Sequence, residues 1–480
     1  MAGGELPPLG GPPLTFPEVQ RLVEARSKAI RLECDDGTKG RFLVAKRRIS
    51  PGEVIFTEQP LFRGKSDAAC SRKAYTAEFV ALTEDRHDEE LEDDCLHPRS
   101  PLVDCLASII LTKQRSESTA EEESSRARAR LRLRQLASLH HAEVTTPVPE
   151  GCARELRDSL RPELRELISE DEIHNILWIV GTNRFGTQHS QLDLMYAGSM
   201  FEHSCGPNCF VGSSMRCSNS DDTRQYRALR EIEEGEALSI DYLLLPDSYL
   251  GAAGRAALLA HWGFACQCPR CTSLPELTRS FRCPACAGHE LCPPRPGAGA
   301  ELVCRTCGIT APVAYAARCL AEELVLLGDR APAGAAEVVA AAEAAAAAAA
   351  DGGANEEATG DNGGELISRY HLAAFNVAWS YAEQRIDDDE AFRAALEALV
   401  ECISRVYGQK HPQLLDLYHE LAVLEEDDLG EQQHYLQLEH GLLKHFYPEE
   451  AQRQDDEILK LVQGRGPHQS NYELELGAMD

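Results

Sequence analysis

The chain has 480 residues and a hydrophobic fraction of 43%, which predicts about two to four domains with well-buried cores. Its formal net charge of −30 argues against nucleic-acid binding by the protein as a whole, because phosphate backbones would repel it. The acidity suits basic partners such as lysine-rich protein tails, with plain solubility as the alternative explanation.

No apolar run approaches the roughly 20 residues that span a bilayer, so we expect no membrane association. Residues 1–17 are rich in Pro and Gly and have neither a basic start nor an apolar stretch, which argues against a secretory signal. We therefore expect an intracellular protein, in the cytoplasm, the nucleus or both. In such a reducing compartment, Cys-x2-Cys pairs indicate metal binding and not disulfides.

The N-terminal part of the chain has the pattern of β-strands. Asp-Gly and Ser-Pro-Gly turns separate three stretches that alternate or run apolar, at residues 30–34, 42–45 and 54–59. The following segment, 65–130, is predicted to be irregular and polar. Its acidic run at 84–94 and its Ser/Glu stretch at 116–125 are expected to be exposed or partly disordered.

Two helices are expected next. Five arginines alternate with Ala and Leu from Arg126 to Arg134 and lead into a helix that ends near His141. This basic stripe is interpreted as a solvated helix face, with a nuclear-import signal or a substrate contact as alternatives. The second helix is predicted over 161–180, where apolar residues recur at helical spacing.

The C-terminal third is helical and acidic. Residues 331–364 are rich in Ala and Gly, which predicts a flexible linker or a weak helix. Residues 366–480 are predicted to be helical throughout.

Tyr242 ends a short predicted strand, 237–240, that follows a Glu-Gly-Glu turn. A tyrosine in such a place usually serves packing. Its neighbours in the sequence make it a candidate for catalysis.

Three cysteines lie within six residues, at Cys266, Cys268 and Cys271. A tight turn aims three thiolates at one ion, but tetrahedral zinc needs a fourth ligand, for which Cys205 and Cys209 are the candidates. The alternative is a set of unpaired buried cysteines.

A second set of cysteines has the spacing of a four-cysteine zinc ribbon, with 17 residues between its two Cys-x2-Cys pairs. The expected ligands are Cys283, Cys286, Cys304 and Cys307, with His289 or Cys292 as substitutes for one of them. We expect a closed structural zinc site without a catalytic water. A zinc-ribbon nucleic-acid binder is disfavoured, because aromatic and basic residues are not interleaved around it.

Taken together, these motifs resemble SET-domain lysine methyltransferases and, within them, the SMYD family. The stretches that carry the resemblance are Lys39 to Ala45, Gly181 to Phe185, Met195 to Met200, Glu202 to Cys209 (with His-Ser-Cys-x-Pro-Asn), Ser239 to Tyr242 and His261 to Cys266. The resemblance covers about 28–64 and 131–275. Gly408 to Pro412, followed by Leu414 to Leu424, looks like the tetratricopeptide-like helices of SMYD proteins.

The resemblance implies an α+β protein: a β-rich SET fold with a knot-like C-terminal segment, a helical insert, a zinc site after the SET core, a zinc ribbon and an all-α tetratricopeptide-like domain. The expected segments are an N-terminal extension (1–27), SET strands (28–64), the irregular insert (65–130), helical insert and SET core (131–250), zinc segment (251–275), ribbon (276–312), linker (313–365) and helical domain (366–480).

The resemblance also implies site residues. S-adenosylmethionine would lie against Lys39, Gly40 and Arg41, with Asn183, Glu202 and His203 around it and Phe264 near its adenine. Tyr242 would be the catalytic residue, bordering the cofactor and the channel for the substrate lysine. Cys205 would complete the first zinc site, and both zincs would be structural. The expected partner is a basic protein substrate with an accessible lysine, and further proteins on the helical domain.

The sequence departs from the family at four points. The family carries the seven cysteines and one histidine of its MYND zinc finger after the entry strands. Here the only cysteines in that region are Cys70, Cys95 and Cys105, with His97 beside Cys95, so that finger is not expected. The other departures are Phe42 for a glycine, Glu202 for an asparagine and Trp262 for a second channel tyrosine. They leave open the alternative of a catalytically silent SET scaffold or transcriptional regulator that acts through protein contacts.

Overall fold

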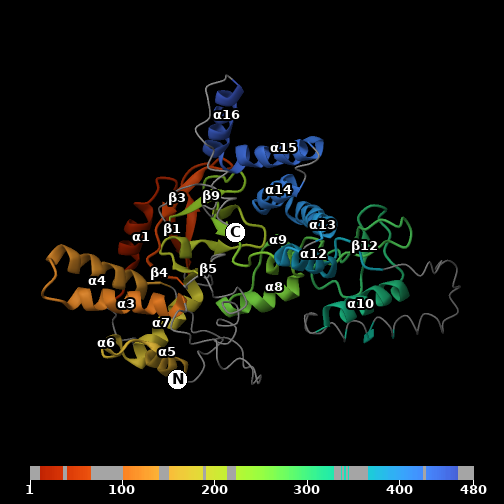
Figure 1. Ribbon diagram of the computed structural model, residues 1–480. Coiled ribbons are helices and arrows are strands. Elements are labelled where there is room, and N and C mark those ends of the chain that lie inside the picture. Colours follow the sequence, from red (N-terminus) through yellow and green to blue (C-terminus); the bar gives the residue numbers. More distant parts are fainter. Residues whose placement is uncertain are drawn as a thin grey trace.

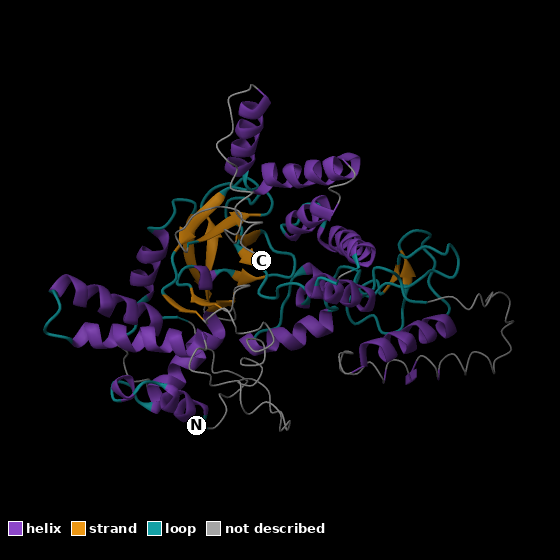
Figure 2. Ribbon diagram, in the orientation of Figure 1, coloured by secondary structure: helices purple, strands orange, loops and turns teal. Residues whose placement is uncertain are grey.

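The computed structural model describes most of the chain in segments: residues 11–35, 40–65, 101–139, 151–186, 191–212, 223–328, 337, 340–341, 344, 366–386, 388–424 and 429–462. A β-rich core lies beside a helical insert, and a helical C-terminal region and a small cysteine-rich lobe extend from the other side of the core (Figure 1, Figure 2). Within the described segments, no helix is long and apolar enough to cross a membrane.

The described strands of the core are short and form two two-stranded and two three-stranded sheets. They are β1 (Ile30–Asp35), β2 (Gly40–Ala45), β3 (Val54–Glu58), β4 (Phe62–Lys65), β5 (Arg184–Gly186), β6 (Gln191–Leu194), β7 (Glu202–His203), β8 (Cys209–Gly212), β9 (Arg224–Ala228) and β10 (Ser239–Ile240). The pairs β1–β2, β3–β9–β8 and β4–β6–β5 are antiparallel, and β7–β10 is parallel. The three predicted N-terminal strands are confirmed as β1, β2 and β3.

The segment that leads to Tyr242 lies between β2 and β7 and forms backbone hydrogen bonds with both. The backbone N–H of Leu238 donates to the Leu43 carbonyl on one side, and its own carbonyl accepts from Glu202 N–H on the other. This arrangement brings the strand that begins at Gly40 beside the strand that ends at Ile240, although almost 200 residues separate them in the chain. It explains how distant sequence motifs meet in one place.

The helical insert lies against one side of the strands (Figure 1). Its helices are α3 (Pro101–Glu117), α4 (Glu123–Ala137), α5 (Cys152–Ser159), α6 (Pro162–Arg165) and α7 (Glu170–Asn183), and α1 (Phe16–Glu24) precedes β1.

The prediction of an irregular segment over 65–130 is wrong for residues 101–130, which form α3 and most of α4. Leu106, Ile109 and Ile110 bury the face of α3 in the core. Gly64 on β4 permits this close packing, because a Cβ atom there would come within 1.7 Å of the Pro101 carbonyl oxygen. Residues 66–100, with the acidic run, lie outside the described segments.

The helix predicted over 161–180 is two helices, α6 and α7. Ser169 begins α7 with a capping box, in which its side chain accepts from Glu172 N–H and the Glu172 carboxylate accepts from Ser169 N–H. The arginine-rich helix is confirmed as α4, which ends at Ala137 instead of near His141. His141 is not among the described residues.

The rest of the chain is mainly helical. Its elements are η1 (Gly198–Met200), η2 (Asp247–Tyr249), α8 (Ala252–Leu259), η3 (Ala260–Trp262), α9 (Pro269–Thr272), β11 (Leu291–Cys292), β12 (Val303–Cys304), α10 (Val313–Leu327), α12 (Leu372–Gln384), α13 (Asp389–Tyr407), α14 (Gln413–Leu424), α15 (Leu429–Phe446) and α16 (Pro448–Val462). The helical prediction for 366–480 is confirmed up to Val462, with breaks between the helices. The linker assigned to 313–365 is wrong for residues 313–327, which form α10 and bury side chains such as Ala316 and Leu320. The Ala- and Gly-rich part, 331–364, falls almost entirely outside the described residues.

The helical region is fixed to the β-core through Arg227 on β9. Its guanidinium is buried, donates to the carbonyls of Gly52 (3.0 Å) and Phe446 (3.2 Å) and lies over the Tyr447 ring. At Gly52 (φ +75°) a Cβ atom would come within 2.0 Å of the His445 carbonyl oxygen, so only glycine fits this contact. The end of α15 is thereby held against the β3–β9–β8 sheet.

Candidate functional site

Tyr242 lies two residues after the end of β10, in a small apolar cluster that it shares with Leu243, Leu259 and the first set of cysteines. Its hydroxyl donates to the Phe201 carbonyl oxygen at 2.5 Å. Burial, together with the charge of Glu202, raises the pKa of the phenol. The hydroxyl is therefore protonated at neutral pH and held in one orientation.

Aromatic rings surround Tyr242. The ring centroids of His203, Trp262 and Phe264 lie 5.2, 5.6 and 6.2 Å from the centroid of the tyrosine ring. Trp262 is anchored by its indole N–H, which donates to the Thr182 carbonyl at 3.1 Å. These side chains come from β7, η3 and the segment after η3, so three separate parts of the chain build one aromatic box.

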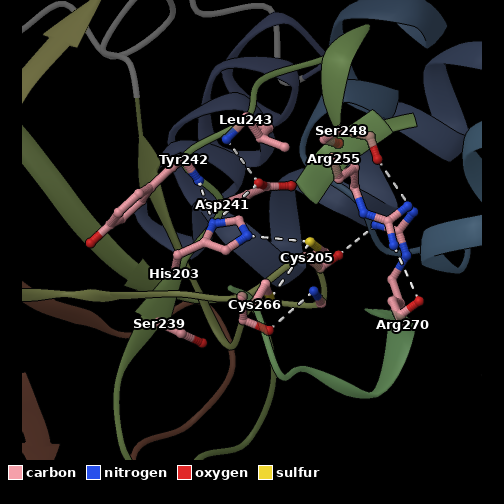
Figure 3. Close-up of polar contacts among 12 residues, drawn as sticks. His203, Cys205, Ser239, Asp241, Tyr242, Leu243, Ser248, Arg255, Cys266 and Arg270 are labelled. Carbon is pink, nitrogen blue, oxygen red and sulfur yellow. Dashed lines mark hydrogen bonds and ion pairs between the residues drawn. The ribbon is translucent and has the colours of Figure 1, made fainter. Parts of the chain in front are cut away.

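His203 lies between Tyr242 and the first set of cysteines (Figure 3). Its Nδ1 accepts from the backbone N–H of Tyr242 at 3.1 Å, and its Nε2 lies 3.2 Å from the Cys205 sulfur. The side chain is 0% exposed, and this burial lowers the pKa of the imidazole to about 4. The ring is therefore neutral at pH 7.

Asn208 ends the His-Ser-Cys-x-Pro-Asn motif and holds the loop after β7 against the strand before Tyr242. Its side-chain amide donates to the Ala237 carbonyl (2.8 Å) and to Glu236 Oε1 (2.9 Å), and its Oδ1 accepts from Ser239 N–H (2.8 Å). The side chain is buried. The asparagine of the motif thus serves the local fold, by fixing β10 beside the start of β8.

The first set of cysteines is assembled as predicted. The sulfurs of Cys205, Cys266, Cys268 and Cys271 lie within 4.8 Å of one another. The rival candidate, Cys209, is buried elsewhere and donates to Asn208 Oδ1 at 3.3 Å. Four cysteine sulfurs this close together match the donor set of a structural zinc site.

Two arginines that the sequence analysis missed support this cluster. Arg255 on α8 donates to Cys271 Sγ (3.4 Å) and to the Arg270 carbonyl (3.2 Å). Arg270 donates to the carbonyls of Cys205 and Ser248 and lies 4.6 Å from the centre of the Tyr407 ring on α13. Arg270 lies inside the Cys-Pro-Arg-Cys turn, so its position next to two expected ligands could have indicated a contact with the cluster. No motif in the sequence indicated such a contact for Arg255.

The second set of cysteines is also assembled. The sulfurs of Cys283, Cys286, Cys304 and Cys307 lie within 4.8 Å of one another, around the β11–β12 hairpin. The predicted substitutes are not part of this group. Cys292 is buried in β11, and the His289 ring lies against Tyr370. Both sets of cysteines are thus compatible with zinc.

The cofactor residues inferred from the family lie in different environments. Gly40 has φ +65°, and the space beside its Cα is open, which suits close approach of a ligand to the backbone. The Arg41 guanidinium donates to the Ser138 carbonyl, and burial lowers its pKa. Asn183 is buried, and its amide donates to the Ile179 carbonyl. Lys39 is outside the described residues.

The structure therefore brings Glu202, His203, Tyr242 and Phe264 to one place, and Gly40 begins a strand that borders it. A cavity of about 590 Å³ opens elsewhere, beside Arg26, Glu58, Arg132 and Tyr196, and none of the inferred cofactor residues lines it. The roles of the individual cofactor residues stay predictions.

One comparison with known families matches part of the chain. Residues 40–243 match the model of the SET domain family. No protein with a curated description matches the chain. Solved structures that match include the SET domain of LSMT bound to lysine and AdoHcy (13% identity, 97% of this chain and 100% of that chain, TM-score 0.32) and Rubisco LSMT bound to AdoMet (12%, 93% and 93%, 0.32). A third is Rubisco LSMT bound to sinefungin and monomethyllysine (13%, 84% and 89%, 0.29). The chain therefore contains a SET domain, which spans residues 40–243.

Proposed function

We propose that this protein is a protein-lysine N-methyltransferase that uses S-adenosylmethionine. The observation that carries the proposal is the position of Tyr242 in the SET domain, at the end of β10, with its hydroxyl fixed on the Phe201 carbonyl and its ring inside an aromatic box. A phenol held in this way is a preorganised dipole, which stabilises charge as it develops.

S-adenosylmethionine would supply an activated methyl group. Gly40, with its open Cα face, and the backbone of Glu202 and His203 would hold it beside Phe264. The chain's own contribution is to orient a lysine amine and to exclude water from it. The apolar walls of Trp262 and Phe264 favour the neutral amine, which is the form that attacks, because burial disfavours an ammonium.

Zinc in the first set of cysteines would hold the segment 266–271 against Cys205, and thus Phe264 and Trp262 beside Tyr242. Its role there would be structural. Zinc in the second set would stabilise the β11–β12 lobe, whose small core includes Phe281, Leu291 and Leu302.

The substrate would be a basic protein with an accessible lysine, in keeping with the net charge of −30. The SMYD-like assignment and the tetratricopeptide-like nature of α12 to α16 belong to the same proposal, as does an intracellular location. The helices α12 to α16 follow one another as packed neighbours, an arrangement that exposes a broad helical surface to protein partners (Figure 1).

The rival is a catalytically silent SET scaffold. It is favoured by Trp262, whose indole N–H is engaged by Thr182 where many SMYD proteins offer a tyrosine hydroxyl, and by the charge of Glu202 beside Tyr242. In that case, protein contacts of the helical region would be the function.

A methyl-transfer assay decides between the two. The zinc-loaded protein is incubated with radiolabelled S-adenosylmethionine and mixed histones, or with a basic non-nuclear protein, beside a Tyr242→Phe variant. We expect transfer to lysine by the wild type and a loss of about 100-fold or more in the variant, because one preorganised hydroxyl is removed. Transfer that is equal in both proteins contradicts the role of Tyr242, and no transfer by a protein that binds S-adenosylmethionine supports the scaffold.

A further inference from the structure

The two hydrogen-bonding atoms of the His203 ring face two different functional groups. Nδ1 accepts from the Tyr242 backbone N–H, and Nε2 lies 3.2 Å from the Cys205 sulfur (Figure 3). Tyr242 in turn donates through its hydroxyl to Phe201, which precedes β7. One buried ring therefore stands between the candidate metal centre and the candidate catalytic tyrosine.

The contact with Tyr242 replaces a backbone hydrogen bond. In the parallel β7–β10 ladder, Glu202 N–H donates to the Leu238 carbonyl and Ser204 N–H donates to the Ile240 carbonyl. If the ladder continued, the N–H of Tyr242 would donate to the Ser204 carbonyl. It donates instead to the imidazole. The side chain of His203 thus determines where the chain leaves the sheet.

Geometry also fixes the tautomer of this ring. A backbone N–H is always a donor, so Nδ1 uses its lone pair to accept from Tyr242 and carries no proton. Asp241 Oδ1 is 3.7 Å from Nδ1, beyond hydrogen-bonding distance. The ring proton is then on Nε2, which faces Cys205, and an N–H donor to a metal-bound thiolate orients that ligand.

We propose that His203 is a positioning residue that couples occupancy of the first metal site to the position of Tyr242. The proposal rests on the proposed methyltransferase function, and it assigns His203 a role distinct from direct cofactor binding. Metal in the Cys205 group fixes the sulfur, the sulfur fixes the ring, and the ring fixes the backbone of Tyr242. Loss of the metal would therefore displace the backbone of Tyr242 through this ring, in addition to loosening Phe264 and Trp262.

Two substitutions separate the two ends of the ring. In His203→Asn, the amide oxygen stands near the place of Nδ1, so the contact with Tyr242 is kept and the contact with Cys205 is lost. In His203→Gln, the longer side chain places its amide N–H near Nε2, so the donor to Cys205 is kept and the acceptor for Tyr242 is lost. Each variant is the matched control of the other.

Three readouts are compared in the full-length protein: the rate of zinc release to a chelator, the amide resonance of Tyr242 in 15N-tyrosine-labelled protein (assigned with Tyr242→Phe), and kcat for methyl transfer. For His203→Asn we expect release about tenfold faster or more, with an unchanged Tyr242 resonance when zinc is saturating. For His203→Gln we expect release within about threefold of wild type, a shifted Tyr242 resonance and a kcat about tenfold lower or more.

The proposal is overturned if His203→Asn and His203→Gln have the same effects on zinc release and on the Tyr242 resonance. A ring that only fills space would give that result. The wild-type protein offers a test that needs no substitution: removal of zinc must shift the Tyr242 amide resonance, and an unmoved resonance contradicts the coupling. This test is independent of the proposed function. Zinc release and the Tyr242 resonance can be measured even if the wild-type protein transfers no methyl group, so they test the coupling by themselves.

Discussion

The two sets of cysteines share one donor set but differ in their surroundings. In the first set, Cys205 is fully buried and packs in the same cluster as Tyr242, Trp262 and Phe264. In the second set, Cys286 and Cys307 are exposed, and the core of the lobe belongs to β11, β12 and α10. The same chemistry thus serves two purposes: one metal would be built into the candidate site, and the other would hold together a lobe beside it.

The hydrogen bonds around the two sets show the same difference. His203, Arg255 and Arg270 contact the first set, and Arg270 extends the connection to α13 through Tyr407. Beside the second set, Arg305 is about half exposed and pairs with Glu290. When hydrogen bonds connect metal ligands to other elements, loss of the metal disturbs those elements as well. When the ligands are exposed, the disturbance stays within their own lobe.

The largest effect is expected from a comparison of ligand substitutions. Cys268→Ser should reduce methyl transfer by about 100-fold or more, because loosening the first cluster displaces the aromatic box around Tyr242. Cys286→Ser should release one zinc and reduce transfer by less than about fivefold. The measurement is methyl transfer together with zinc content for each variant. Equal losses of transfer in the two variants would remove the distinction between the sites.

The second test uses pH, on the lobe side of the comparison. Burial opposes ionisation of Glu323, but hydrogen bonds and charges from Arg279 and His371 outweigh it and lower its pKa from 4.5 to about 2. Because the folded pKa is depressed, its contribution is fully present above pH 4.5 and is lost as the pH falls toward 2. This contribution amounts to about 2–3 kcal/mol.

The check is the free energy of unfolding of the wild type and of Glu323→Gln between pH 7 and pH 3. The difference between the two should shrink as the pH falls, since a neutral side chain has no charge to lose. Loss of zinc from thiolates in acid affects both proteins alike and cancels in the comparison. Parallel stability curves would show that this ion pair does not titrate as expected.

A third comparison concerns the arginines beside the two clusters. Arg270→Ala removes hydrogen bonds to Cys205 and Ser248 and the contact with Tyr407, so it should lower the free energy of unfolding by about 2 kcal/mol. Arg305→Ala removes only an exposed ion pair and should lower it by less than about 1 kcal/mol. Urea unfolding followed by tryptophan fluorescence measures both. A larger loss in the Arg305 variant would reverse the ranking.

Elements that are marked by a short sequence motif could be predicted, whereas elements that depend on contacts distant in the chain could not. The strands β1 to β3 follow from short apolar stretches between turns, and the two cysteine sets follow from their spacing. Helix α3 was missed because its apolar residues, such as Ile109 and Ile110, lie between two polar stretches that dominate the composition of the region. The helix is buried because it packs between β4 and α4, and the composition of the segment cannot predict such a tertiary contact.

The candidate site shows the same limit. The choice of Cys205 over Cys209, left open by spacing, came from the family resemblance, and in the structure the Cys205 sulfur lies with the other three. The contacts of the His203 ring could not be predicted, because the Tyr242 N–H and the Cys205 sulfur meet this ring only once β7 and β10 are paired. Arg255 reaches the cluster from α8, which is distant in sequence from Cys205, so no local pattern marked it.

If the SET domain of this chain transfers a methyl group as proposed, the protein must bind S-adenosylmethionine. Isothermal titration of the zinc-loaded, full-length protein with S-adenosylmethionine tests it most directly. We predict one site with micromolar affinity, retained in Tyr242→Phe. Absence of binding by a well-folded, zinc-loaded protein would contradict the methyltransferase proposal and leave the helical region as the functional surface.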